Sequence, residues 1–270
     1  MREGKYGSTL ARHGLRGMAL GYVGLLLLLP LSSLFVQVFR DGVGIFWAEL
    51  TRPAALYALR LTFIVAGITT VVNSICGTLA GFILVRCAVP GKSFFNAVVD
   101  LPFAIPTVAT GLMLVLTFGP MTIIGVLFRN MGIDIIFALP GIVLAMLFVT
   151  FPFTIRMVEP VLAELQPQSE EAAKTSGASG WQTFWWVIFP EIRRGILTGC
   201  TLTFARSLGE FGTIIMVAGN VPMRTQTAPL YVFSEFESYN YAGATAVSVV
   251  LALVSFTMLL VLEYYLKRRT

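Results

Sequence analysis

The chain has 270 residues, of which 56% are hydrophobic and 12% are charged, and its mean hydropathy is +0.81. A soluble globular domain carries about 25% charged residues, so this chain has about half the charge that a surface facing water needs. The composition therefore excludes an ordinary soluble enzyme, a disordered protein and a disulfide scaffold, and it indicates an integral membrane protein.

Few residues are available for metal or nucleophile chemistry. His13 is the single histidine, and the three cysteines, Cys76, Cys87 and Cys200, are scattered along the chain. Catalytic triads and His-ligated metals are therefore almost excluded, and we expect the cysteines to be inert. The formal net charge of +5 does not indicate a nucleic-acid partner, because no basic patch is interleaved with aromatic residues.

Long apolar segments predict six membrane-spanning helices, since a helix needs about 20 mostly apolar residues to cross a bilayer. The predicted spans lie near residues 16–39, 55–85, 93–118, 137–158, 195–217 and 242–265. The first span follows basic residues, as a signal peptide does, but it is too long and lacks a small-x-small cleavage site. We expect it to be kinked at Pro30, and we place residues 119–128 in an apolar outer loop or a re-entrant segment. The predicted fold is an all-α integral membrane protein with one transmembrane domain over residues 1–270.

The distribution of Lys and Arg predicts the orientation, because cytoplasmic loops are enriched in both. With a cytoplasmic N-terminus, thirteen of these residues fall in cytoplasmic segments and four in outer segments. The cytoplasmic set is Arg2, Lys5, Arg12, Arg16, Arg86, Lys92, Arg156, Lys174, Arg193, Arg194, Lys267, Arg268 and Arg269, and the outer set is Arg40, Arg52, Arg129 and Arg224. Both termini are therefore predicted to be cytoplasmic.

The predicted cytoplasmic segment between spans four and five, Glu159–Arg194, is much longer than a usual connection in a helical bundle. Ser169 is a candidate N-cap for a short helix whose acidic residues, Glu170 and Glu171, stand at its positive end. Gly177 is placed to end this helix as a C′ residue. The segment is therefore expected to be ordered.

A second short helix is predicted through Trp181–Ile188, with Ser179 as its N-cap and Pro190 at its end. It carries several aromatic residues and few charges. An apolar surface of this kind in water predicts a partner with a matching groove.

The same segment carries a recognisable motif. Glu171-Ala172-Ala173 is followed after three residues by Gly177, and after nine more by Val187-Ile188-Phe189-Pro190. The pattern resembles the EAA signature, E-A-A-x3-G-x9-I-x-L-P, of permease subunits of bacterial binding-protein-dependent ABC importers, with Val187 and Phe189 in place of the usual Ile and Leu. The six spans, with this loop between the fourth and fifth, also match the family pattern. The resemblance implies a coupling helix that docks into a groove of a cytoplasmic ATPase.

In that case, the residues expected to contact the ATPase are Glu171, Ala172, Ala173, Gly177, Ala178, Trp181 and Pro190. Other phrases are similar to the sulfate/thiosulfate permeases of the family, namely Asp100-Leu-Pro-Phe-Ala-Ile-Pro-Thr and Arg206-Ser-Leu-Gly-Glu-Phe-Gly212 followed by Ala218-Gly-Asn220. The second phrase leans to the T-type subunit of a T-type/W-type heterodimer. Molybdate and tungstate permeases share much of this sequence, so they are the alternative to a sulfate/thiosulfate permease.

The resemblance also implies the partners: a W-type permease, two ATPase subunits that hold ATP and Mg²⁺, and a periplasmic sulfate-binding protein. This chain would bind no cofactor, and it lacks the G-x-x-x-x-G-K-[ST] phosphate loop, so the energy must come from another subunit. It is expected to be a permease and not an enzyme. Two rivals from other classes are a secondary anion transporter or channel and an intramembrane enzyme.

Four residues are candidates for the anion path: Arg206, Ser207, Glu210 and Asp100. Arg206 and Glu210 are spaced i,i+4 within predicted span five, so their side chains lie on one face of the helix. Either they form a purely structural ion pair, or Arg206 faces the anion and Glu210 sets the orientation of its guanidinium. Asp100 precedes Pro102 and Pro106, which are expected to break the helix. It is either an interfacial residue beside a packing kink or a residue that lines the path.

Overall fold

The computed structural model describes residues 4–165 and 167–267, and within these ranges the chain is helical and has no strand. The elements in chain order are α1 Gly4–Val23, the π-helical turn η1 Gly24–Leu28, α2 Leu29–Asp41, α3 Val43–Leu50, α4 Pro53–Arg86, α5 Lys92–Ala104, α6 Thr107–Phe118, α7 Ile123–Asn130, α8 Leu139–Glu164, α9 Pro167–Thr175, α10 Gly180–Thr183, the π-helical turn η2 Phe184–Ile188, α11 Phe189–Leu208, α12 Gly212–Ala218, α13 Ala228–Glu237 and α14 Tyr241–Lys267.

Within the described residues, four helical segments are long and apolar enough to cross a membrane, namely His13–Asp41, α4, α8 and α14. A fifth arises if α5 and α6, which are bent by 111° relative to each other, form one span. The bend lies at Pro106, as proline restricts the preceding residue to an extended conformation, and Ile105 has φ −85° and ψ 131°. Pro102, in contrast, lies inside α5 without ending it.

The predicted fifth span, residues 195–217, is wrong as a continuous helix. α11 ends at Leu208, and α12 begins only at Gly212. Gly209 caps α11, and Glu210 and Phe211 lie in the interruption. Residues 119–128, predicted as an outer loop or a re-entrant segment, contain most of α7. Thr122 caps this helix by accepting a hydrogen bond from the Gly125 N–H at 3.0 Å.

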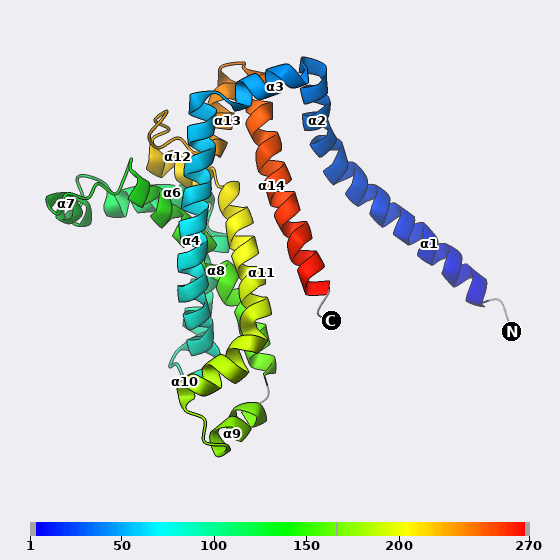
Figure 1. The fold of residues 1–270 in the computed structure, drawn as a ribbon, viewed down its shortest axis with the longest axis vertical. Coiled ribbons are helices and arrows are strands. Elements are labelled where there is room, and N and C mark those ends of the chain that lie inside the picture. Colours follow the sequence, from blue (N-terminus) through cyan, green and yellow to red (C-terminus); the bar gives the residue numbers. More distant parts are fainter. Residues whose placement is uncertain (1–3, 166, 268–270) are drawn as a thin grey trace.

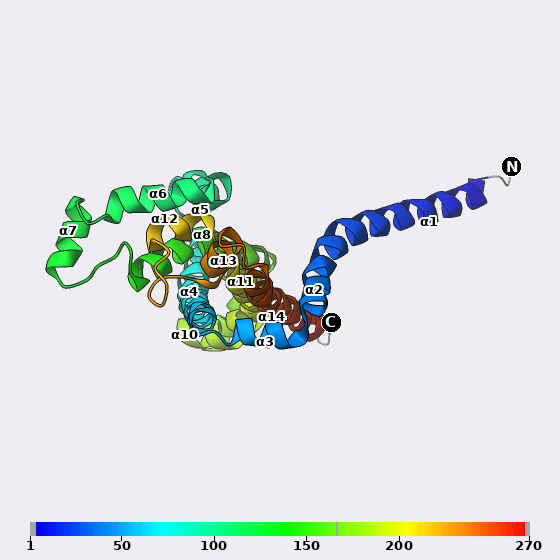
Figure 2. The same ribbon diagram turned by 90° about the horizontal axis from the view of Figure 1, so that it is seen from above.

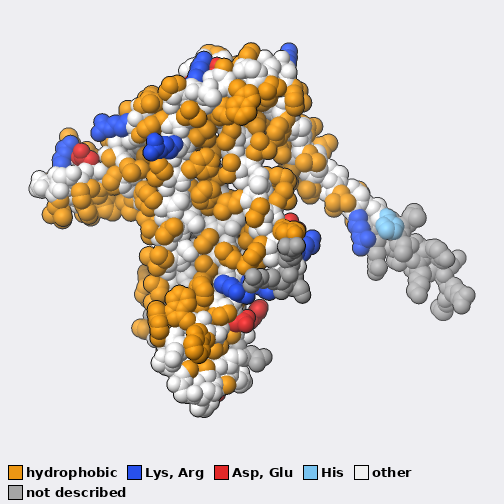
Figure 3. Space-filling model, in the orientation of Figure 1, with side chains coloured by type: hydrophobic (Ala, Val, Ile, Leu, Met, Phe, Trp, Pro, Cys, Tyr) orange, Lys and Arg blue, Asp and Glu red, His pale blue; other side chains and the backbone are white. Residues whose placement is uncertain are grey.

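The helices form an elongated bundle with two distinct ends (Figure 1). α9 and α10 lie at one end of the bundle, and α3 and α13 lie at the other. α1 runs away from the bundle, and the view from above shows the same separation (Figure 2). The chain bends between α1 and α2, where η1 directly precedes the predicted kink at Pro30. Hydrophobic side chains cover most of the visible face, and the charged ones form a few small groups (Figure 3).

The centre of the bundle is α8, against which α4 and α11 pack through glycines. A Cβ on Gly77 of α4 would lie 2.9 Å from the Thr154 Cβ, and one on Gly199 of α11 would lie 2.8 Å from the Thr154 Cα. Gly81 and Gly195, one turn from each, also face the α8 backbone. Small residues four apart let helices approach closely in a membrane, where lipid offers no hydrophobic driving force. Gly77 and Gly81 therefore serve the close packing of α4 on α8.

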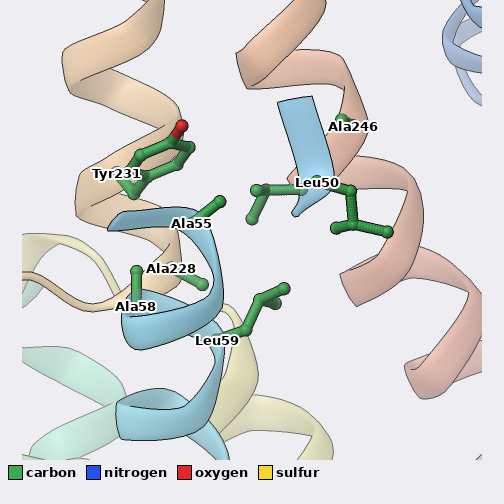
Figure 4. Packing of buried hydrophobic residues seen from close by; sticks show 8 residues of the cluster. Leu50, Ala55, Ala58, Leu59, Ala228, Tyr231 and Ala246 are labelled. Atoms are coloured by element: carbon green, nitrogen blue, oxygen red, sulfur yellow. The ribbon is translucent and has the colours of Figure 1, made fainter. Parts of the chain in front are cut away.

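A hydrophobic cluster joins four helices at the α3–α13 end (Figure 4). Its members are Leu50 of α3, Ala55, Ala58 and Leu59 of α4, Ala228 and Tyr231 of α13, and Ala246 and Val247 of α14. Four of these eight residues are alanines, which let the helices approach one another closely. The cluster fixes the short helices α3 and α13 to the ends of the long helices.

Candidate coupling loop and candidate anion path

The loop between α8 and α11 is shorter than predicted, because these helices extend further than the predicted spans. α8 continues to Glu164, and α11 begins at Phe189. The first short helix, α9, begins at Pro167, so the prediction that Ser169 is its N-cap is wrong. The reason is that proline is favoured in the first turn of a helix, where its missing N–H needs no partner. Glu170 stands in the first turn and Lys174 in the last, as the helix dipole favours.

Gly177 ends this part of the loop in the predicted way. Its φ is +86°, in the left-handed region that glycine adopts without strain. The Gly177 N–H donates to Lys174 O and the Ala178 N–H donates to Ala173 O, both at 3.0 Å. These two bonds form a Schellman motif, which satisfies the last carbonyls of α9 and reverses the chain direction.

Ser179 begins the second short helix, α10, as predicted. Its Oγ accepts from the Gln182 N–H at 3.3 Å, and its own N–H donates to Gln182 Oε1 at 2.8 Å. This reciprocal pair is a capping box. The prediction that Pro190 ends the helix is wrong: the chain passes through η2 into α11, and Pro190 lies in the first turn of α11. The Phe189 N–H donates to Phe184 O, and this wider π-turn carries the helix past the proline.

The predicted apolar surface of the second helix is present and lies beside α4. The Phe184 ring contacts Phe82 of α4 edge-on, with centroids 6.4 Å apart. Trp181 and Trp185 line a groove of about 710 Å³ together with Ile75 and other residues of α4. These two tryptophans therefore face a groove along a span. Trp186 is largely exposed and lies outside the lining of this groove.

The predicted pair of Arg206 and Glu210 is formed. Arg206 Nη2 lies 2.6 Å from Glu210 Oε2, and the Glu210 side chain is 1% exposed whereas that of Arg206 is 34% exposed. Glu210 Oε1 accepts from the Thr213 N–H at 2.9 Å. Ser207 is buried, and its hydroxyl donates to Thr203 O at 2.8 Å, so it is used within its own helix.

The pair lies at the interruption between α11 and α12. Arg206 is in the last turn of α11, and Glu210 precedes the first residue of α12. A cation at a helix C-terminus and an anion at a helix N-terminus both interact favourably with the helix dipoles. The interruption between α11 and α12 thus holds a paired arginine and glutamate, the form in which charges are tolerated within a membrane.

Asp100 lies elsewhere in the molecule, beside Arg156 of α8. The Asp100 carboxylate accepts from Arg156 Nε at 2.8 Å and lies 2.7 Å from Arg156 Nη2. Arg156 also pairs with Glu159 at 2.5 Å and donates to Asn96 O at 3.1 Å. The structure therefore brings Arg206, Ser207 and Glu210 together and places Asp100 in a separate ion pair that joins α5 to α8.

Sequence reasoning missed Arg156 and Arg86 as contact residues. Each has an acidic partner, Asp100 or Glu170, on a helix distant in sequence. The i,i+3 spacing of Arg156 and Glu159 is the one local signal for the first of these groups. Within the described residues, no group of three or more His, Cys, Asp and Glu side chains is placed to hold a metal ion.

The sequence of residues 73–270 matches the family described as "Binding-protein-dependent transport system inner membrane component". This chain belongs to that family and is a multi-pass protein of the inner membrane. Within the family, it is 42% identical over 242 residues to the sulfate transport system permease protein CysT of Synechocystis sp., covering 90% of this chain and 85% of the relative. It is also 43% identical over 253 residues to CysW of the same organism, covering 94% of this chain and 91% of the relative.

Solved structures share the fold. A bacterial ABC transporter involved in the import of the acidic polysaccharide alginate has a chain with a TM-score of 0.79 at 16% identity, covering 98% of this chain and 97% of that one. A chain of the MetNI methionine ABC transporter in an inward-facing conformation has a TM-score of 0.60 at 20% identity, covering 82% and 100%. At these identities, the likeness concerns the fold alone.

Proposed function

We propose that this chain is the T-type permease subunit of an ATP-driven importer that moves sulfate or thiosulfate across the inner membrane by alternating access. The observation that carries this proposal is the identity of about 40% to curated sulfate permeases over about nine tenths of the chain. The chain performs no chemistry on the anion. It binds no cofactor, and ATP and Mg²⁺ belong to the partner ATPases.

The proposed topology has six spans and cytoplasmic termini. The five spans given by helix length and the bend of α5 and α6 become six when α11 is counted, because α11 runs beside α4 and α8 along the bundle (Figure 1). The Lys and Arg bias supports cytoplasmic termini. A reporter inserted at Ser169 is then expected to report the cytoplasm, and one inserted at Met223 the outside. A periplasmic signal from Ser169 contradicts both the orientation and the ATPase contact.

The proposed partners are a W-type permease, two ATPase subunits and a periplasmic sulfate-binding protein. Both CysT and CysW relatives are similar to this chain along most of its length, which fits two homologous permeases in one importer. The fold neighbour for alginate was solved with a periplasmic protein that carries an alginate pentasaccharide. The apolar segment His13–Asp41 has no buried residue in its most apolar window, which leaves it free to contact lipid or a second permease.

The proposed ATPase contact is the surface of α9 and the turn that follows it. Glu171, Lys174 and Gly177 are exposed on this surface at the far end of the bundle. The Schellman motif and the capping box fix the ends of both short helices, so that a movement of the ATPase can be passed on to the bundle. Pro190 and Trp181 lie nearer to α4 and α11, so we assign them to the attachment of the loop to the bundle rather than to the surface that contacts the ATPase.

The proposed anion contact is Arg206. The Arg206 side chain is one-third exposed even though Glu210 pairs with it, and a guanidinium has more donors than one carboxylate occupies. Ser207 and Asp100 are less favoured, because the hydroxyl of Ser207 bonds within its helix and Asp100 is held by Arg156. An anion that crosses the low-dielectric interior needs such a cation to offset its desolvation.

The test of the whole proposal is reconstitution. The chain is co-expressed with the proposed W-type permease and ATPase subunits, and the complex is placed in liposomes with the proposed sulfate-binding protein. We expect uptake of [³⁵S]sulfate that requires ATP and is reduced by excess thiosulfate. ATP-dependent uptake that only molybdate reduces supports the molybdate alternative, and uptake driven by an ion gradient without ATP supports a secondary transporter.

A further inference from the structure

An arginine at the end of α4 joins three elements at the coupling end of the bundle. Arg86 is the last residue of α4. Its Nη2 lies 2.6 Å from Oε1 of Glu170, which is in the first turn of α9. The same nitrogen donates to Leu165 O at 3.3 Å, and Leu165 is the residue that follows α8. One side chain thus contacts the ends of α4 and α8 and the beginning of α9.

The two adjacent glutamates of the loop face different surroundings. The side chains of Arg86 and Glu170 are 21% and 18% exposed, so the ion pair is mostly shielded from water. Glu171 is exposed. Successive residues of an α-helix point about 100° apart around its axis, so Glu170 and Glu171 do not face the same partner. The first is turned toward α4, and the second is left to face away from the bundle.

The buried hydrophobic cluster at this end contains no residue of α9. The nearest hydrophobic cluster joins α4, α8, η2 and α11, and its members are Val158, Leu162, Ile188 and Ile192 with Phe82, Val85, Val161, Leu165, Phe184 and Ile196 around them. None of these residues belongs to α9. α9 packs against α10 and η2, and the Arg86–Glu170 ion pair links it directly to α4. The two charges are 2.6 Å apart and mostly shielded from water, so their attraction is weakened less by solvent than that of an exposed pair.

We propose that Arg86 is a positioning residue that couples α9 to α4, so that a displacement of the loop moves α4 and, through Gly77 and Gly81, the helices of the bundle. This inference rests on the proposed function, since it assumes that an ATPase displaces the loop. Without the ion pair, α9 is linked to α4 only indirectly, through α10 and η2, and follows its movement less closely. ATP is then hydrolysed without a matching movement of the spans.

The test compares Arg86→Gln and Glu170→Gln in the reconstituted complex, with Arg129→Gln as the matched control. Arg129 pairs with Asp134 at 3.4 Å in a highly exposed position before α8, so its loss removes an ion pair without touching the loop. We expect assembly and basal ATP hydrolysis to persist in all three variants. The amount of sulfate transported per ATP is expected to fall by about fivefold in Arg86→Gln and Glu170→Gln, which is the low end of typical coupling between two sites. The same ratio is expected to be unchanged in Arg129→Gln.

Two results overturn the proposal. One is a normal ratio of transport to hydrolysis in both Arg86→Gln and Glu170→Gln. The other is a loss of assembled complex with transport and hydrolysis falling in proportion, which indicates a purely structural pair. The swap Arg86→Glu/Glu170→Arg is expected to recover part of the ratio, because it restores the ion pair but not the bond to Leu165.

A distance measurement separates this proposal from the proposed function. Spin labels are placed at Lys174→Cys in α9 and Ile83→Cys in α4, both exposed, after the native cysteines are replaced by serine. We expect a narrow distance distribution in the parent and a wider one in Arg86→Gln. An equally narrow distribution overturns the link, whatever the transported anion. If the parent shows no ATP-dependent sulfate uptake, the proposed function fails on its own.

Discussion

Glu210 binds Arg206 across the end of α11, with 2.6 Å between the carboxylate and the guanidinium. The two residues are unequally exposed, because Glu210 is buried and Arg206 reaches a more open space. Glu210 also binds the first turn of α12 through the Thr213 N–H. The carboxylate therefore holds the two halves of the broken span together, and the guanidinium is the member of the pair that can reach a ligand.

The unequal exposure predicts unequal effects of removing each partner. Arg206→Ala leaves a buried carboxylate without a cation, which costs up to about 3–5 kcal/mol for a fully buried pair and less here because Arg206 is partly exposed. Glu210→Gln leaves an arginine that water can reach. We expect a lower melting temperature in detergent for Arg206→Ala than for Glu210→Gln. Equal melting temperatures contradict this account of the pair.

The anion role of Arg206 requires a variant without an orphaned carboxylate. Arg206→Ala/Glu210→Gln is expected to recover the stability that Arg206→Ala loses while remaining about tenfold or more slower in sulfate uptake than Glu210→Gln, which corresponds to about 1.4 kcal/mol. Arg206→Lys is expected to restore uptake in part, since the charge is kept and the fork is lost. Uptake by the double variant at the rate of Glu210→Gln removes Arg206 from the path.

Close packing on α8 gives a prediction about stability. Gly199→Ala places a Cβ 2.8 Å from the Thr154 Cα, and the backbone of α8 cannot rotate away as a side chain does. Overpacking of this kind costs about 1–3 kcal/mol. Gly67→Ala in α4 is the control, because its Cβ meets nothing within 4 Å and alanine is the better helix former. We expect a lower melting temperature for Gly199→Ala and an equal or higher one for Gly67→Ala.

The spans could be predicted largely from sequence because bilayer thickness sets the length of an apolar helix. The sequence does not signal the break at Gly209–Phe211, since the apolar residues continue on both sides and local hydropathy does not report a change of direction. The sequence predicts a helix break at both Pro102 and Pro106, but only Pro106 lies at a helix end. The distinction depends on which neighbours supply compensating contacts, and a single sequence does not contain that information.

The loop was predictable where its structure is local. Gly177 and Ser179 act through hydrogen bonds to residues within five positions, and the predictions for both are confirmed. The predictions for Ser169 and Pro190 are wrong, because a proline can begin a helix as well as end one. Arg86 with Glu170, and Asp100 with Arg156, are joined only by the tertiary fold. No spacing rule pairs residues so far apart in the chain.

The Asp100–Arg156 ion pair predicts that Asp100 has a minor effect on transport. Asp100→Asn leaves Arg156 bound to Glu159, and Asp100 is 53% exposed, so the loss is about 0–1 kcal/mol. Arg156→Ala leaves two carboxylates facing each other and is expected to reduce assembly more. Sulfate uptake per assembled complex is the measurement. A severe loss of uptake in Asp100→Asn, with normal assembly, places Asp100 in the anion path instead.

Gly177 allows strain in the loop to be separated from contact with the ATPase. Its φ of +86° penalises any side chain, by about 1–2 kcal/mol for most residues and less for asparagine. A Cβ at Gly177 meets nothing within 4 Å in this chain, so there is room for it unless a partner protein contacts this turn.

Gly177→Asn is expected to keep part of the transport and of the ATPase stimulation. Gly177→Glu is expected to abolish both while the protein stays in the membrane, because the added charged side chain blocks the docking surface. Normal transport by Gly177→Glu contradicts the assignment of this turn to the ATPase contact, and equal losses in both variants indicate that backbone strain alone is responsible.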